Sequence, residues 1–209
     1  MNSHKIDAKE FLKREKKLLY YLKNRPSAYD IATAASKSCN SFGDDGYIFE
    51  ASWHVEHGNG GLEITVAGNI EINREGEFTF YSYVLCVCKD NVLLRKYHYD
   101  YECNRGRDKP MFHLQYGGLP LPSLASYGGV EELSAWLSEP RLFYTPMSLA
   151  LILEQVFLEF PNDITNKIQQ DNSWKGHVRE SQKALLAPYF ELCKKKIIDN
   201  ECLYADCYA

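Results

Sequence analysis

The chain has 209 residues, of which 45% are hydrophobic and 25% are charged. A chain of this length buries roughly 70% of the surface that its unfolded form exposes, so it needs neither a metal nor disulfides to stabilise a core. No apolar run is long enough to cross a membrane. The net charge of −4 gives no overall attraction to nucleic acid, so any contact with RNA must come from a local patch.

The cysteines and the N-terminal residues predict where the protein works. The seven cysteines are odd in number and show no repeated C-x-x-C spacing, which argues against a disulfide scaffold and a zinc ribbon. Residues 1–17 carry charges at helical spacing and lack the apolar segment of a secretion signal. We therefore expect a cytoplasmic protein with reduced thiols, no membrane contact and no cofactor. Its oligomeric state is left open.

The N-terminal segment, residues 1–40, is predicted to be helical. Apolar residues recur at helical spacing over 6–23, with Lys and Glu between them, which is typical of an amphipathic helix. Pro26 ends this helix, because proline disfavours the helical conformation of the residue before it. A second, weaker helix is predicted over 28–36.

Residues 47–116 change to β-branched and aromatic residues separated by turn formers, which predicts strands. The five expected strands cover 47–56, 62–72, 77–88, 92–102 and 111–116. The first three connections between them are too short for crossover helices, so neighbouring strands should pair as an antiparallel meander.

Residues 130–200 are predicted to form the C-terminal helices. A short helix is expected over 130–137, and a strongly apolar one over 147–160. That apolar helix needs cover on more than one side, by the sheet and by later helices. The last helical pattern covers 175–200 and contains Pro188, which predicts two helices or a kink. Within this last pattern, the side chains expected to cover the apolar helix are Leu185, Leu186, Phe190 and Ile197.

Together these elements predict one α+β domain over residues 1–209. An antiparallel meander of about five strands should carry the N-terminal helix and the C-terminal helices on one face. No internal repeat and no low-complexity linker supports a second domain.

The most distinctive polar pattern is the segment 95–102, in which polar and aromatic residues alternate. Side chains alternate between the two faces of a strand, so His98 and Asp100 should share one face, with tyrosines on the other. The next strand should place His113 and Gln115 together on one of its faces. If the two strands pair, His98, Asp100 and His113 can converge.

This convergence has three interpretations. Two imidazoles and a carboxylate can act as acid and base in phosphodiester cleavage, because histidine exchanges protons near neutral pH. The same groups can hold a divalent metal. They can also form the solvated face of a half-buried sheet. The first interpretation makes His98, Asp100 and His113 catalytic and assigns no metal. The residues expected to bind the substrate are then Arg95, Lys96 and Gln115.

Residues 78–116 resemble small bacterial proteins of the TumE toxin-like group, which are linked to toxin–antitoxin systems and mobile elements. The resemblance rests on an Arg-aromatic-x-Asp strand followed by a Pro-x-x-His strand, and it carries over to Arg95, Asp100 and His113. Where that group has a second histidine two residues after the first, this chain has Gln115. The resemblance implies a bacterial toxin or defence role.

Two functional hypotheses follow. In the first, the protein acts on RNA or binds it through the face that carries His98, Asp100 and His113. In the second, it is a non-catalytic adaptor whose tyrosine-rich sheet docks a protein partner from the same operon. Whether the chain is an enzyme is left open at this point.

Overall fold

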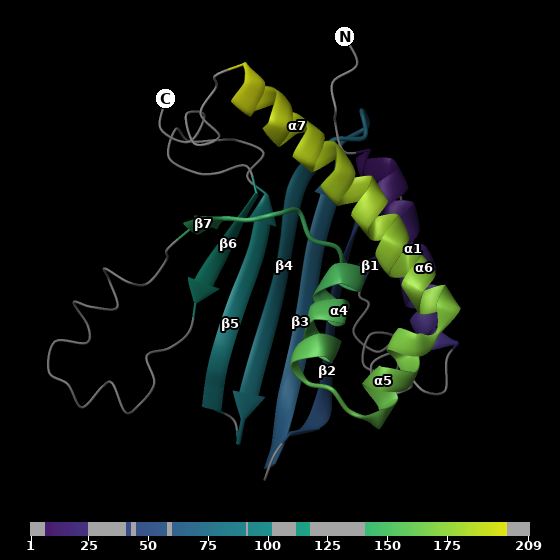
Figure 1. Cartoon of the computed structure of the whole chain (residues 1–209), viewed down its shortest axis with the longest axis vertical. Coiled ribbons are helices and arrows are strands. Elements are labelled where there is room, and N and C mark those ends of the chain that lie inside the picture. The colour runs from purple at the N-terminus through teal and green to yellow at the C-terminus, as the bar shows by residue number, and fades with distance from the viewer. Residues whose placement is uncertain are drawn as a thin grey trace, which may run out of the picture.

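Seven strands form one antiparallel sheet in which each strand pairs with the next along the chain (Figure 1). The strands are β1 Ser41–Phe42, β2 Gly46–His57, β3 Gly60–Ile72, β4 Phe78–Lys89, β5 Val92–Tyr101, β6 Phe112–Gly117 and β7 Arg141–Phe143. The computed structural model describes residues 7–24, 41–42, 45–57, 60–90, 92–101, 112–117 and 141–199.

The predicted meander is confirmed. Strands β2 to β6 begin and end close to the five predicted ranges, and β1 and β7 add one short strand at each edge of the sheet. Tight connections explain this order, because a turn such as residues 73–77 leaves room only for an antiparallel neighbour. The backbone of that turn is closed by a hydrogen bond from the Asn73 amide to the Glu77 carbonyl, at 2.9 Å.

The two faces of the sheet differ in chemistry and in cover. Along β4 the odd-numbered residues from Tyr81 to Val87 are buried, whereas the even-numbered residues from Ser82 to Cys88 are partly exposed. The buried side chains form the core together with the helices, so this is the core face. We call the opposite side the open face, and no helix of the described part of the chain covers it.

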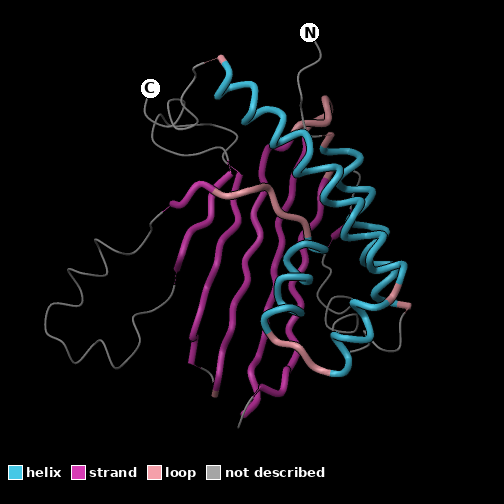
Figure 2. The backbone as a smooth tube through the Cα atoms, in the orientation of Figure 1, coloured by secondary structure: helices cyan, strands magenta, loops and turns pink. Residues whose placement is uncertain are grey.

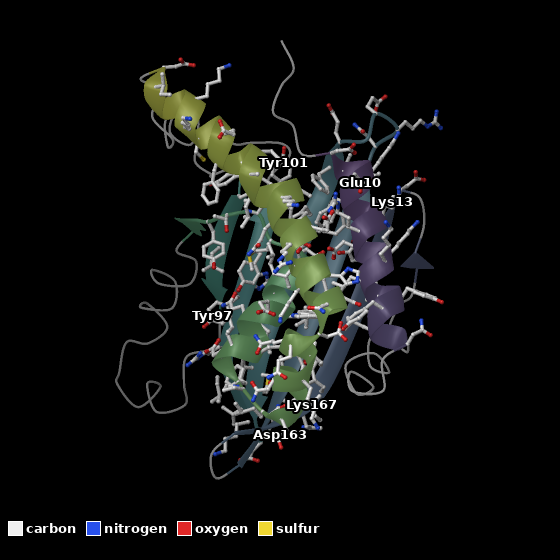
Figure 3. All side chains as sticks on the ribbon, turned by 45° about the vertical axis from the view of Figure 1, so that its right-hand side comes forward. Glu10, Lys13, Tyr97, Tyr101, Asp163 and Lys167 are labelled. Carbon is white, nitrogen blue, oxygen red and sulfur yellow. The ribbon has the colours of Figure 1, made fainter. Side chains whose placement is uncertain are left out.

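The helices that the structure describes lie on the core face, as predicted (Figure 2). They are α1 Ala8–Lys23, α4 Leu149–Glu159, α5 Asp163–Gln170, α6 Asn172–Ser181, the π-helix η2 Gln182–Leu186 and α7 Ala187–Ile198. Helix α1 begins where Asp7 accepts a hydrogen bond from the Glu10 amide at 3.0 Å. Its outer side carries the ion pair between Glu10 and Lys13, both labelled in Figure 3.

Helix α4 packs across the core face, which confirms its predicted position. Ile152 and Phe157 are fully buried, and the Tyr99 hydroxyl of β5 donates to Gln155 at 2.9 Å. The predicted outer cover is found in part: Leu185 is buried in the core, Leu186 is partly exposed and Phe190 is 53% exposed. The side chain of Ile197 lies outside the described residues. Trp174 of α6, which was not predicted, packs on Phe157 with ring centroids 5.2 Å apart.

The helices that follow α4 begin at Asp163 rather than near residue 175, so the sequence analysis missed α5. The last helical pattern contains two α-helices, α6 and α7, separated by the π-helix η2 just before Pro188, which agrees with the predicted two helices or kink. Proline cannot donate the hydrogen bond that an α-helix requires at this position. The wider π turn precedes that position, which is a common way for a helix to accommodate a local irregularity.

Two predicted helices, 28–36 and 130–137, lie outside the described residues. Among the helices that the structure does describe, none has both the length and the apolar character that a membrane crossing requires.

Replacing Asn162 with alanine should lower the free energy of unfolding by about 1 kcal/mol. The Asn162 side chain accepts hydrogen bonds from the backbone amides of Ile164 and Thr165, both at 2.9 Å. In return, the Thr165 hydroxyl accepts one from the backbone amide of Asn162 at 2.8 Å. Chemical denaturation measures the loss. Asn162→Asp, which retains the acceptor, should restore most of the stability, and equal losses in both variants would contradict the role of this cap.

Candidate functional site

The polar pattern of β5 lies on the open face. Lys96, His98 and Asp100 are partly exposed there. Tyr97 and Tyr99 alternate with them on the core face, where they are 8% and 2% exposed. Figure 3 labels Tyr97 and Tyr101, which mark this helix-facing side of β5. The predicted division of the strand into two faces is therefore confirmed.

The pairing of β5 with β6 brings the predicted residues together along the backbone. Asp100 lies directly opposite His113, and His98 lies directly opposite Gln115. Directly paired residues of an antiparallel sheet share a face, and diagonal neighbours such as His98 and His113 lie about 7–8 Å apart. We call Lys96, His98, Asp100, His113 and Gln115 the open-face cluster. The side chains of His113 and Gln115 lie outside the described residues.

Arg95 does not belong to this cluster, contrary to the prediction that it binds the same substrate. It points to the core face, where its guanidinium forms an ion pair with Glu159 of α4. The reason is the two-residue period of the strand, which puts Arg95 on the side of the tyrosines. Lys96 lies on the open face, where it pairs with Cys86 of β4. Burial raises the pKa of the Cys86 thiol, and the nearby Lys96 ammonium partly offsets this rise.

The cluster combines two proton-exchanging side chains, one carboxylate and one cation. Asp100 opposite His113 is the arrangement in which a carboxylate can orient an imidazole and fix its tautomer. Within the described residues, no three His, Cys, Asp or Glu side chains gather closely enough to hold a metal, a finding that does not cover the His113 side chain.

Three described tyrosines of β2 and β4 lie in the core rather than on an exposed surface. Tyr47, Tyr81 and Tyr83 are at most 2% exposed on the core face. Their hydroxyl groups bond to helices or to the segments before them: Tyr81, for example, accepts from the Met147 amide at 3.1 Å. The adaptor hypothesis expected the tyrosine-rich sheet to dock a protein partner; it stays a prediction, and these three buried rings are not available for such contacts.

A second group of functional side chains was missed by the sequence analysis. Glu15 of α1 is 1% exposed, and its Oε2 atom accepts three hydrogen bonds. The donors are the Tyr83 hydroxyl at 2.7 Å, the Tyr47 hydroxyl at 3.0 Å and the Leu149 amide at 3.2 Å. Glu15 therefore links α1 to two strands and to the start of α4.

Burial raises the pKa of Glu15 to about 7, even though the three hydrogen bonds lower it. Desolvation outweighs these bonds because an ionised carboxylate loses its hydration when it enters the core. The two tyrosine hydroxyls also contact each other.

Glu15 also lines a cleft of about 190 Å³ between α1 and α6. His177 of α6 forms part of the wall, and burial followed by the nearby Lys17 lowers its pKa. Shifted carboxyl and imidazole groups in one cleft are a recognised sign of a functional site. The signal in the sequence was a charged residue within the apolar stripe that Phe11, Leu18 and Leu22 define.

Comparisons with protein-family models, with curated proteins and with solved structures find no match to this chain.

Proposed function

We propose that the open-face cluster binds single-stranded RNA and cleaves its phosphodiester backbone by acid–base catalysis. The observation that supports this most is the register of β5 and β6, which makes His98 and His113 diagonal neighbours on one face. A separation of about 7–8 Å between diagonal neighbours leaves room for a phosphate between two imidazoles.

In this mechanism one histidine takes the proton of the ribose 2′-hydroxyl, and the 2′-oxygen attacks the phosphorus. The bond to the 5′-oxygen breaks, and the other histidine donates a proton to that leaving oxygen. The products are a 2′,3′-cyclic phosphate and a 5′-hydroxyl. Lys96 stabilises the negative charge that gathers on the phosphoryl oxygens. Asp100 orients His113, its direct partner across the strands.

Binding should depend only weakly on salt. Besides the protonated histidine that acts as the acid, the cluster contains one cation, Lys96, and each phosphate contact to a single strand contributes a slope of about −0.7 to the dependence of log K on log salt. Sequence recognition would then come from unstacked bases rather than from a duplex. A toxin or defence role, which the resemblance of residues 78–116 implies, is compatible with such an activity.

The test is cleavage of mixed single-stranded RNA by the purified chain in the presence of EDTA. Cleavage should occur, and His98→Ala and His113→Ala should each lower its rate by about 10²- to 10⁴-fold. His54→Ala is the matched control, because His54 is an exposed histidine of β2 on the same open face. DNA of the same sequence should stay intact, because it lacks the 2′-hydroxyl.

Three outcomes would contradict the proposal. The chain could leave RNA intact and fail to bind it, or His113→Ala could retain full activity. Cleavage that EDTA abolishes and a divalent cation restores would assign the cluster to a metal instead.

A further inference from the structure

A buried acid, Glu15, lines the cleft between α1 and α6 and is 1% exposed. All three hydrogen bonds to its carboxyl group reach Oε2, and every donor is a neutral hydroxyl or amide. Among the described residues, none of the groups that shift the pKa of Glu15 is a cation. Buried charges in proteins are normally paired, so a counter-charge is missing here.

The nearest candidate on the same helix, Arg14, is engaged elsewhere. Its guanidinium lies 3.2 Å from Glu10 and 2.5 Å from Glu180 of α6. It also donates to the backbone carbonyl of Glu180 at 3.0 Å. Arg14 therefore joins α1 to α6 by ion pairs with carboxylates other than Glu15.

The walls of the cleft offer acceptors for a hydrogen-bond donor. His177 is half-buried, and its lowered pKa keeps the imidazole neutral at pH 7, so one ring nitrogen can accept. Ser181 of α6 is buried and adds a hydroxyl. The charged side chains that line the cleft are three carboxylates and two cations, namely Glu10, Glu15, Glu180, Arg14 and Lys17. The lining is therefore acidic overall.

We propose that this cleft binds a small ligand through a primary ammonium group, which pairs with the free side of the Glu15 carboxylate and donates to His177. An ammonium group carries three donors and a compact positive charge, and it matches a carboxylate, an imidazole and a hydroxyl. The volume of about 190 Å³ lies below that of clefts for drug-sized ligands, so the ligand has only a few heavy atoms. The cleft lies on the core side of the sheet, so this proposal does not depend on the proposed RNA site.

Protons should compete with the ligand, because the ammonium group pairs only with ionised Glu15. The groups that interact with this carboxyl group are Tyr47 of β2, Tyr81 and Tyr83 of β4, and the Leu149 amide of α4. The charged or titratable groups that line the cleft beside it are His177 and Glu180 of α6, and Glu10, Arg14 and Lys17 of α1. The pKa values of the three tyrosines are raised well above 10 by burial and by Glu15, so these phenols stay neutral. Glu15 and His177 remain as the groups that titrate near neutral pH.

Calorimetric titration of the full chain with ethylammonium chloride tests the proposal. At about pH 8 the wild-type chain should bind one equivalent, with a Kd no lower than about 0.5 mM for a ligand of three heavy atoms. Binding should weaken towards tenfold per pH unit below pH 7, because the ligand requires ionised Glu15. At pH 7, titrations in buffers of different ionisation enthalpy should show proton release.

Glu15→Gln, which retains the size of the side chain, should abolish binding. Glu75→Gln, on the exposed turn between β3 and β4, is the matched control and should bind like the wild type. Tetramethylammonium has the same charge but no N–H donor, and it should not bind. An absence of saturable heat in the wild type up to about 100 mM, far above that Kd, would overturn the proposal. Unchanged binding by Glu15→Gln, or equal binding of tetramethylammonium, would do the same.

Discussion

Replacing Leu153 with alanine is expected to lower the free energy of unfolding by about 2 to 5 kcal/mol. Leu153 is 1% exposed in α4, the helix that packs on the core face of the sheet beside α6. The substitution removes buried methyl groups and leaves a cavity, because neighbouring core side chains are held by other contacts, such as those of Trp174 with Phe157 and Glu154. Urea denaturation measures the loss as a lower midpoint at unchanged slope.

Leu158→Ala is the matched control for this prediction. It makes the same substitution in the same helix, but Leu158 is 67% exposed, so its loss should stay within about 0.5 kcal/mol. A loss below about 0.5 kcal/mol for Leu153 itself would mean that α4 contributes little to the core.

The sheet could be predicted because its information is local. Each connection from β2 to β5 is a short turn, and a short turn leaves antiparallel pairing as the only solution. The alternation along β5 likewise separated His98 and Asp100 from Tyr97 and Tyr99. The same alternation separates Arg95 from His98, so that error lay in the assignment of Arg95 and not in missing information.

The burial of the tyrosines could not be predicted from the strands alone. A hydroxyl on a strand favours a partly wet face unless a partner for it exists inside the protein. Here the partners lie far along the chain, as when Tyr99 donates to Gln155 at a separation of 56 residues. Local alternation shows that two faces differ, but it does not show which face the helices cover.

Glu15 was missed for the same reason. Its position in the apolar stripe of α1 is local, but its hydrogen bonds come from Tyr47, Tyr83 and Leu149, which are 32, 68 and 134 residues away. A charged residue in such a stripe can also reach solvent along its flexible side chain. Only the packing of α1 on the sheet and against α4 distinguishes a buried acid from an exposed one.

The buried Glu15 should make the stability of the protein fall as pH rises from about 4.5 to about 7. Its folded-state pKa of about 7 lies above the ordinary value of 4.5, so within this window the folded chain retains a proton that the unfolded chain has lost. The stabilising contribution of the protonated group is complete below the lower value and is lost above the higher one. The difference between the two values corresponds to roughly 3 kcal/mol.

Glu15→Gln isolates this effect, because glutamine is close in size, accepts hydrogen bonds from Tyr47 and Tyr83, and does not titrate. Other groups change the stability of both proteins alike, so the informative quantity is the difference between their free energies of unfolding. From about pH 5 to about pH 8 that difference should shift by roughly 2 to 3 kcal/mol in favour of the variant. Denaturation curves at several pH values measure it. Parallel pH profiles for the two proteins would show that Glu15 is ionised in the folded chain throughout this range.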